Sequence, residues 1–283
     1  MKITLFVLTI FVFRISTAQE LSVSVSSGYN HKMAPSTFGV FLKDNFISAF
    51  YPYSVEYSTY SLGKGINSNI GINYTSKNNF GFQIEGSYLY GLSTTNVSDY
   101  YINDFIRKEI FSRYCRIIPQ FNYIQKINNF ELKFHVGAII NWGSFTLTQE
   151  QFDEEYNQGF KYVNKFSGGV SFGMITGISS IFKLNNRFSL FIDLNLISAS
   201  HTPTKRKYIE MYHGETNMID NFPTSVKETE YYNSYEAYTT SDPNSPSKSL
   251  KFKTPNSSIG LQIGVNFQLW KKADKNDQLK IEN

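Results

Sequence analysis

The sequence predicts an all-β fold: a closed antiparallel transmembrane β-barrel of eight strands. Three observations predict it. Apolar and polar residues alternate in eight segments, short and long connections alternate between those segments, and aromatic residues gather at the segment ends. The mean hydropathy of −0.30 is ordinary for a soluble protein. This value is typical of barrels, because only every second residue of a strand faces lipid.

The first eighteen residues have the pattern of a cleaved export signal. Lys2 gives a positive start, residues 3–13 form an apolar run, and Ala18 ends a small-residue cleavage site. The run is too short to cross about 30 Å of hydrocarbon as a helix, and Arg14 interrupts its end. We therefore expect a signal peptide over residues 1–18, the barrel over 19–270 and a charged periplasmic tail over 271–283.

The first four alternating segments cover residues 21–26, 66–74, 80–90 and 115–123. In the first, leucine and valine alternate with serine; in the second, isoleucine alternates mainly with asparagine. In the third and fourth, apolar and aromatic residues alternate with polar ones such as Gln83 and Gln120. Many of the eight segments reach about ten residues, the length that a tilted strand needs to cross a bilayer.

The last four alternating segments cover residues 130–142, 170–182, 188–196 and 259–269. The polar side of segment 130–142 holds charged residues, and that of segment 170–182 holds glycine and serine. The polar side of segment 188–196 holds Asp193 and Asn195. The last segment alternates leucine, isoleucine, valine and phenylalanine with glycine, glutamine and asparagine. Eight strands of this kind are expected to close into a small barrel.

The connections fall into two classes. Residues 77–79, 128–129 and 185–186 are short and rich in asparagine, which tolerates the positive φ of tight hairpins. Residues 30–64, 92–108, 144–165 and 201–256 are long. With the N-terminus in the periplasm, every short turn falls on the periplasmic side and every long loop on the extracellular side, as in outer-membrane barrels.

An alternative count of ten strands stays open. Residues 38–42 and 46–60 flank a Lys-Asp-Asn turn at 43–45 and could form a further hairpin. The first arm is short for a membrane crossing, so an extracellular hairpin in the first loop is the preferred interpretation.

Aromatic residues at the segment ends predict two girdles at the membrane interfaces. Phe80 and Tyr90 are ten residues apart, about 23 Å along the barrel normal for a tilted strand. The expected girdle residues are Tyr74, Phe80, Tyr123, Phe130, Phe188 and Trp270 at the periplasmic rim, and Tyr90 and Trp142 at the outer rim.

The last segment resembles the C-terminal signal by which the outer-membrane assembly machinery recognises barrels, through Gln262, Gly264, Phe267 and Leu269. The order of hairpins over residues 20–270 resembles small barrels of the OmpX and OmpA-transmembrane type. It is more similar to the PorT-like family, in which an Ile-Pro strand precedes a glycine-containing strand, as residues 114–119 precede 134–137 here. The resemblance implies this fold in the cell outer membrane, with lipid and the assembly machinery as partners, and implies no reaction.

Six ionisable residues share the polar parity of their segments: Glu85, Arg116, Glu131, Lys133, His135 and Asp193. An eight-stranded barrel is wide enough only for side chains, so these groups are expected to pair in a polar lumen network. The alternative is a narrow ion or water path.

No catalytic, cofactor or metal site is expected. The lone Cys115 forms no disulfide within the chain, and a net charge of +4 gives no reason to expect nucleic acid. His135 and His201 have inward parity, while His31 and His213 fall in predicted loops. A barrel-embedded hydrolase acting on lipid or peptide is therefore kept only as an alternative.

The fourth long loop is the most individual part of the sequence. Tyrosine-rich loops make contact surfaces, because tyrosine combines apolar area with a polar tip. The contact candidates are Tyr208, Tyr212, Tyr231, Tyr232, Tyr235 and Tyr238. We expect a non-enzymatic barrel with a structural, adhesive or assembly-accessory role that contacts a protein or surface ligand. A small-solute channel and a soluble barrel with an apolar interior are further alternatives, because alternation alone does not say which face is inside.

Overall fold

The computed structural model describes residues 20–33, 36–43, 54–101, 104–127, 130–153, 158–234 and 242–271. The predicted signal peptide at 1–18 and nearly all of the predicted tail at 271–283 lie outside the described residues. Within the described ranges the chain is almost entirely β-strand, with one short α-helix, α2 (Thr224–Lys227), and one 3-10 turn, η1 (Ile219–Asn221). None of the helices in these ranges is long and apolar enough to cross a membrane.

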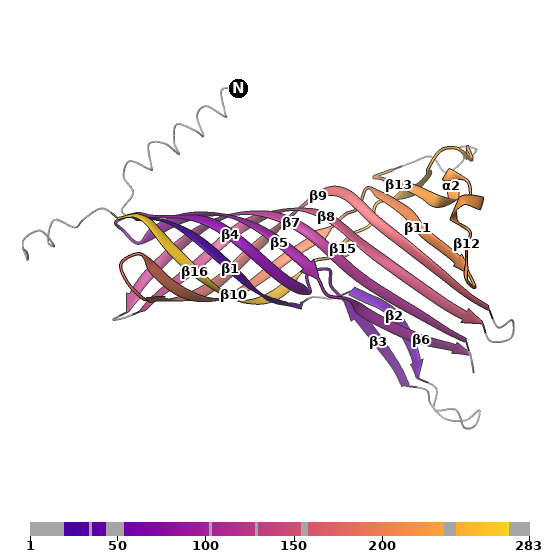
Figure 1. Ribbon diagram of the computed structural model, residues 1–283, viewed down its shortest axis with the longest axis horizontal. Helices are drawn as coiled ribbons and strands as arrows, with labels where there is room; N and C mark the ends of the chain where they lie inside the picture. The colour runs from indigo at the N-terminus through magenta and orange to yellow at the C-terminus, as the bar shows by residue number, and fades with distance from the viewer. Residues whose placement is uncertain are drawn as a thin grey trace, which may run out of the picture.

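Eight antiparallel strands are hydrogen-bonded into a closed ring (Figure 1). Their order around the ring is β1 (Glu20–Lys32), β4 (Gly65–Thr75), β5 (Phe80–Gly91), β7 (Asp104–Ile127), β8 (Phe130–Asp153), β9 (Gln158–Lys183), β10 (Phe188–His201) and β16 (Ser258–Lys271). The last strand pairs with both β10 and β1, so the ring has no free edge. Each of the eight alternating segments of the sequence lies within one of these strands.

The two ends of the ring differ. At one end, here called the turn end, short connections join β4 to β5 and β9 to β10, while residues 128–129 lie outside the described residues. Asn79 has a φ of 64°, which the first turn needs. In the other turn the side-chain oxygen of Asn185 accepts hydrogen bonds from the backbone N–H groups of Arg187 and Phe188 at 2.8 and 2.9 Å. The opposite end is called the loop end.

The hairpin of the ten-strand alternative is not part of the ring. β2 (Ser36–Lys43) and β3 (Ser54–Tyr60) pair only with each other, in a separate two-stranded sheet. Figure 1 shows this hairpin beyond the loop end, beside β6 (Thr94–Tyr101). The first long connection therefore contains an additional hairpin outside the ring.

The long connections predicted over 92–108 and 144–165 consist largely of strand where the structure describes them. β7 and β8 are each 24 residues long and β9 has 26, and they continue past the ring with β6 paired to β7. Continued main-chain pairing leaves few backbone groups without partners. We call this region the sheet extension: residues 104–113, 144–153 and 158–167 with β6, β11 (Lys205–His213), β13 (Glu228–Tyr232) and β14 (Ser247–Leu250).

The fourth long connection is also largely regular. Its strand β11 pairs with β9, β13 pairs with β11, and β14 runs parallel to β13. β12 (Thr216–Asn217) pairs with β11, and β15 (Thr254–Pro255) pairs with the end of β10. The chain of residues 201–256 thus adds strands to the sheet extension and then returns to the ring at β15.

Apolar side chains line the outside of the ring, and most of the inward side chains are polar. On β10, Leu190, Ile192 and Leu194 are exposed on the outer face, while Asp193 and Asn195 are buried within the ring. The same holds on β4, where Ile66, Ile70 and Ile72 are exposed and Asn67 and Asn69 are buried. This arrangement is the opposite of a soluble binding barrel, whose interior is apolar.

Candidate functional site: the lumen of the ring

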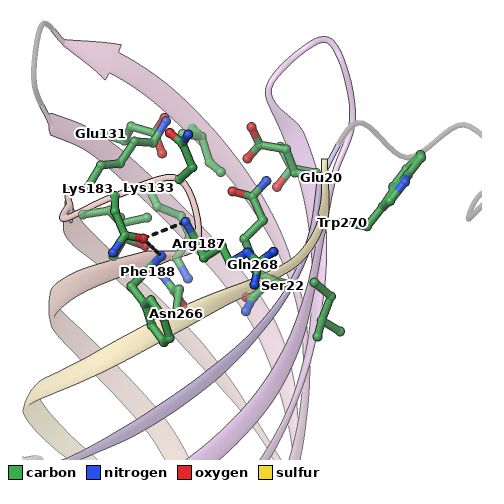
Figure 2. Close-up of a pocket in the computed structure, with 18 of the residues that line it drawn as sticks. Glu20, Ser22, Glu131, Lys133, Lys183, Arg187, Phe188, Asn266, Gln268 and Trp270 are labelled. Atoms are coloured by element: carbon green, nitrogen blue, oxygen red, sulfur yellow. Dashed lines mark hydrogen bonds and ion pairs between the residues drawn. The ribbon is translucent and has the colours of Figure 1, made fainter. Parts of the chain in front are cut away.

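The space enclosed by the ring, the lumen, begins at the turn end with a polar vestibule of about 550 Å³. Figure 2 shows Glu131, Lys133 and Lys183 on one side of its mouth, with Glu20 and Trp270 on the other. Asparagine, glutamine and serine side chains line it together with two further basic residues, Lys126 and Arg187, and a few apolar ones. The carboxylate of Glu131 forms an ion pair with Lys183 Nζ at 2.6 Å. The vestibule is thus a polar, charged opening at this end.

Deeper in the lumen, Asp193 is the centre of a buried hydrogen-bond network. Its Oδ1 accepts from His135 Nε2 at 2.9 Å and from Ser179 Oγ at 2.6 Å, and its Oδ2 accepts from Asn195 Nδ2 at 2.8 Å. Three partners satisfy the carboxylate, so this charge is stabilised in the interior.

Serine, histidine and aspartate also form the triads of hydrolases, yet Ser179, His135 and Asp193 do not have triad geometry. A triad needs the serine hydroxyl hydrogen-bonded to the histidine that takes its proton. Here Ser179 and His135 both donate to the same oxygen of Asp193. The geometry holds the carboxylate and leaves the serine without a base.

Glu85 and Lys133 are linked through one glutamine. Gln83 Nε2 donates to Glu85 Oε2 at 3.0 Å, and Gln83 Oε1 accepts from Lys133 Nζ at 3.0 Å. Lys133 Nζ also lies 5.9 Å from the centre of the inward Phe191 ring, a cation–π distance. One amide therefore bridges two opposite charges that do not touch.

Side chains of two different kinds fill the lumen, one on each side. On the side of β7 to β10, Ile118, Ile139, Ile175 and Ile197 form a buried apolar cluster. On the side of β1, β4, β5 and β16, a chain of buried hydrogen bonds runs from Ser87 through Asn67 and Asn69 to Gln262. An eight-stranded ring leaves little space beyond its side chains, and both sides occupy it.

A second apolar cluster covers the lumen at the loop end. It consists of Leu62, Leu89, Ile110, Tyr114, Phe145, Phe166 and Tyr231. The rings of Phe145 and Phe166 stack with centroids 4.5 Å apart, and Tyr231 of the fourth connection packs against Phe252 at 5.2 Å. Residues of the long connections thus cover this end of the ring.

All six predicted lumen residues point into the ring, but only one pair among them is direct, His135 with Asp193. Glu131 pairs with Lys183, Lys133 and Glu85 share Gln83, and Arg116 donates to Asn256 at 3.1 Å. The parity of the sequence already implied that Gln83 and Ser179 point inward. The partner Asn256 was missed, because it follows a long connection with no alternation.

The three remaining histidines have different surroundings. His201 is fully buried, with its ring 5.1 Å from that of Tyr114. The ring of His213 stacks on Phe160 at 4.6 Å. The prediction that His31 and His213 lie in loops was wrong. His31 is in β1 on the outward face, beside Tyr29, because β1 extends to Lys32, and His213 is the last residue of β11. No group of three metal-ligating residues is found in the described ranges.

The predicted girdle residues lie on the outward face, near the ends of the ring strands. Cross-strand aromatic pairs mark the turn end: Phe80 with Tyr123, Phe130 with Phe182, and Phe188 with Phe267, with ring centroids 5.2, 6.3 and 5.1 Å apart. Tyr74 and Trp270 belong to the same end, and Tyr90 and Trp142 lie toward the loop end.

The four residues of the predicted assembly signal divide between the two faces of β16. The side chain of Gln262 points inward and Gly264 lies at a buried position of the same parity, whereas Phe267 and Leu269 are exposed on the outer face. A Cβ atom at Gly264 would lie 2.4 Å from Cζ of the inward Phe191 ring. The glycine therefore makes room for that ring.

The tyrosines of the fourth connection have different surroundings. Tyr208 lies under the guanidinium of Arg206 at 4.8 Å and beside Tyr162, and Tyr212 is half-buried on the same strand. Tyr231 is buried in the loop-end cluster, whereas Tyr232 is exposed. A hydrogen bond from the Tyr232 hydroxyl to Glu230 raises the pKa of Tyr232 and lowers the pKa of Glu230. Tyr235 and Tyr238 lie outside the described residues.

A ring of eight antiparallel strands with an apolar exterior and a polar, filled interior defines the structural class of this chain. No protein-family model matches the chain, and no curated protein sequence matches it. Among solved structures, it is similar to Ail, the attachment invasion locus protein of Yersinia pestis, solved with the heparin analogue sucrose octasulfate. The identity is 10%, the TM-score is 0.32, and the match covers 88% of this chain and 98% of Ail.

A second solved structure is OmpT, an outer membrane protein of Vibrio cholerae. The identity is 9% with a TM-score of 0.09, over 88% of this chain and 97% of OmpT. TM-scores this low do not assign the chains to one fold.

Proposed function

We propose that this chain is an integral β-barrel of the cell outer membrane, exported by a cleaved signal peptide at residues 1–18. The single observation that carries the proposal is the inverted ring, with isoleucine, leucine, valine and phenylalanine exposed around its outside. In water, an apolar belt of this extent promotes association, whereas acyl chains remove it from solvent. A closed ring also satisfies its main-chain hydrogen bonds internally, as a membrane requires.

The proposed role is non-enzymatic: structural, adhesive or assembly-accessory, with contacts made by the sheet extension on the extracellular side. This role is supported by the length of β7, β8 and β9, which carry a sheet well past the girdle residues. The exposed Tyr232 and Ile209, and the Arg206–Tyr208 pair, offer contact area for a protein or surface ligand.

The filled lumen argues against the channel alternative. The isoleucine cluster, the amide hydrogen bonds and the loop-end cluster leave the vestibule without an evident path across the ring. We expect purified protein in planar bilayers to show no stepwise conductance at any voltage. Reproducible single-channel steps that scale with protein concentration would contradict this expectation.

Location is tested by membrane fractionation and heat-modifiable gel mobility. We expect the protein in the outer-membrane fraction, migrating faster before boiling than after it, because a folded barrel resists the detergent. Protein recovered as a freely dissolved monomer would overturn the proposal.

The contact role is tested by crosslinking on intact cells, comparing the full chain with a variant lacking residues 205–250. The variant must first show heat-modifiable mobility, which establishes that its ring is folded. We expect the crosslinked partners to be lost in the variant. An unchanged partner set would exclude the fourth connection as the contact surface.

A further inference from the structure

The strongest unexplained feature of the lumen is Arg116. Its side chain is 1% exposed, and only one of its three nitrogens has a protein partner: Nη2 donates to Asn256 Oδ1 at 3.1 Å. Nε and Nη1 are buried without a hydrogen-bond partner, and none of the described acidic side chains lies within 4.0 Å of the guanidinium. An arginine cannot give up its proton, so a buried, uncompensated charge there is strongly unfavourable.

The neighbours of Arg116 present further unpaired donors. Asn256 uses its oxygen on Arg116, which leaves its buried Nδ2 free to donate. The buried Tyr114 hydroxyl, two residues along β7 on the same face, has no partner in the described part of the chain. His201, whose ring contacts that of Tyr114 at 5.1 Å, is fully buried with both ring nitrogens unpaired. We call Tyr114, Arg116, His201 and Asn256 the donor site.

The lumen acidic groups are engaged elsewhere. Glu85, the acidic residue on the neighbouring strand β5, accepts from Gln83, which in turn binds Lys133 on the vestibule side. Asp193 is satisfied by His135, Ser179 and Asn195. One acceptor does face Arg116 across the strands, the unpaired Oδ1 of Asn141. A neutral water could bridge these two groups, but it would place no negative charge in contact with the guanidinium.

We propose that the donor site binds a small monovalent anion of chloride size between β7, the end of β10 and the segment that follows β15. The guanidinium has two nitrogens without a hydrogen-bond partner, and the Glu85 carboxylate acts on it only at longer range, so one small anion would complete its hydrogen bonds. All four residues are at most 1% exposed, so the ligand is small and fully desolvated. The anion joins Asn256, at the return of the fourth connection, to the ring strands.

The first test measures the temperature at which the folded gel band is lost, in sodium chloride and in sodium gluconate at equal ionic strength. Binding to the folded state alone raises this temperature in chloride, by about 5 °C at concentrations well above the dissociation constant. Gluconate is too large for the site. Equal temperatures for the wild type in the two salts would overturn the proposal.

Three variants separate site binding from a general salt effect. Asn256→Asp supplies a carboxylate at Arg116 and is expected to remove the chloride dependence. Arg116→Met removes the positive charge and is expected to remove the chloride dependence as well. Arg113→Gln is the matched control, because Arg113 is on the same strand but exposed on the outer face, and it should retain the wild-type shift. Equal chloride shifts in all four proteins would overturn the proposal.

The second test does not depend on any variant. Crystals of the wild-type protein grown in sodium bromide are measured at the bromine absorption edge. An anomalous peak within hydrogen-bond distance of Arg116 would support the anion site. A full-occupancy water at that position, with no anomalous signal, would overturn it.

Discussion

Individual buried side chains show why a filled lumen tolerates charge. Asp193 is held by three donors from β8, β9 and its own strand, so its stabilisation depends on an assembled ring. Gly264 has the opposite role, because it gives space to Phe191 and contributes no side chain of its own. Both residues act through close neighbours, and single substitutions there should have large effects.

We expect Asp193→Ala to lower the free energy of unfolding by about 3–5 kcal/mol, because it leaves His135, Ser179 and Asn195 without their acceptor. The measurement is urea unfolding of protein refolded into lipid vesicles. Asp220→Ala is the control, since Asp220 is exposed in η1 and should change the value by less than about 0.5 kcal/mol. Equal effects of the two substitutions would contradict the network.

Substitution of Gly264 by alanine should lower the free energy of unfolding by about 1–3 kcal/mol, because the new methyl group overlaps the Phe191 ring. Phe191→Leu alone removes part of a buried ring and is also expected to destabilise. Together the two changes should cost less than the sum of their separate effects, which a double-mutant cycle in the same unfolding assay measures. Simple additivity would show that the Phe191 ring is not the reason why position 264 requires glycine.

At the scale of elements, the ring and its additions are separable. β2 and β3 pair only with each other, whereas each ring strand pairs with two ring neighbours. The sheet extension, in contrast, is continuous with β7, β8 and β9 and contributes Tyr231 to the cluster over the loop end. Removing the hairpin should therefore be tolerated better than removing the extension.

Replacement of residues 37–57 by a short glycine–serine linker should leave folding intact, because β2 and β3 pair with each other in a sheet separate from the ring. We expect heat-modifiable mobility in the shortened protein and an unfolding temperature close to that of the full chain. Loss of the folded band would instead favour the ten-strand alternative, in which both arms cross the membrane. Deletion of β4 and β5 together is the control that must abolish folding.

At the scale of the whole molecule, the distribution of apolar surface decides the environment. Ile192 on the ring and Ile209 on the sheet extension are exposed to the same degree, 46% and 43%. In water they would be equivalent surface residues. In the proposed orientation only Ile192 contacts acyl chains, so this pair separates a membrane barrel from a soluble one.

We expect Ile192→Arg to destabilise the protein in lipid vesicles by about 2–4 kcal/mol, the cost of a charge on the lipid face near the bilayer midplane. Ile209→Arg should change the free energy of unfolding by less than about 0.5 kcal/mol. Urea unfolding of both variants in the same vesicles provides the comparison. Equal, small effects would place both residues in water.

The sequence by itself determined the strands and the turns of the ring, because both are set by local chemistry. Period-two alternation defines β10 and β16 residue by residue, and asparagine in the turn before β5 supplies the positive φ found at Asn79. Parity also placed the six predicted lumen residues on one common face of the strands, since a one-residue shift would have turned every side chain to the other face.

Only the tertiary structure decided which face is inside, because alternation is symmetric between the two faces. It also decided the extent of β7, β8 and β9, the packing of Ile139 and Ile175 into one cluster with Ile118 and Ile197, and the contact of Arg116 with Asn256, 140 residues along the chain. These features depend on ring closure, which brings distant strands together around a narrow space that their side chains largely fill.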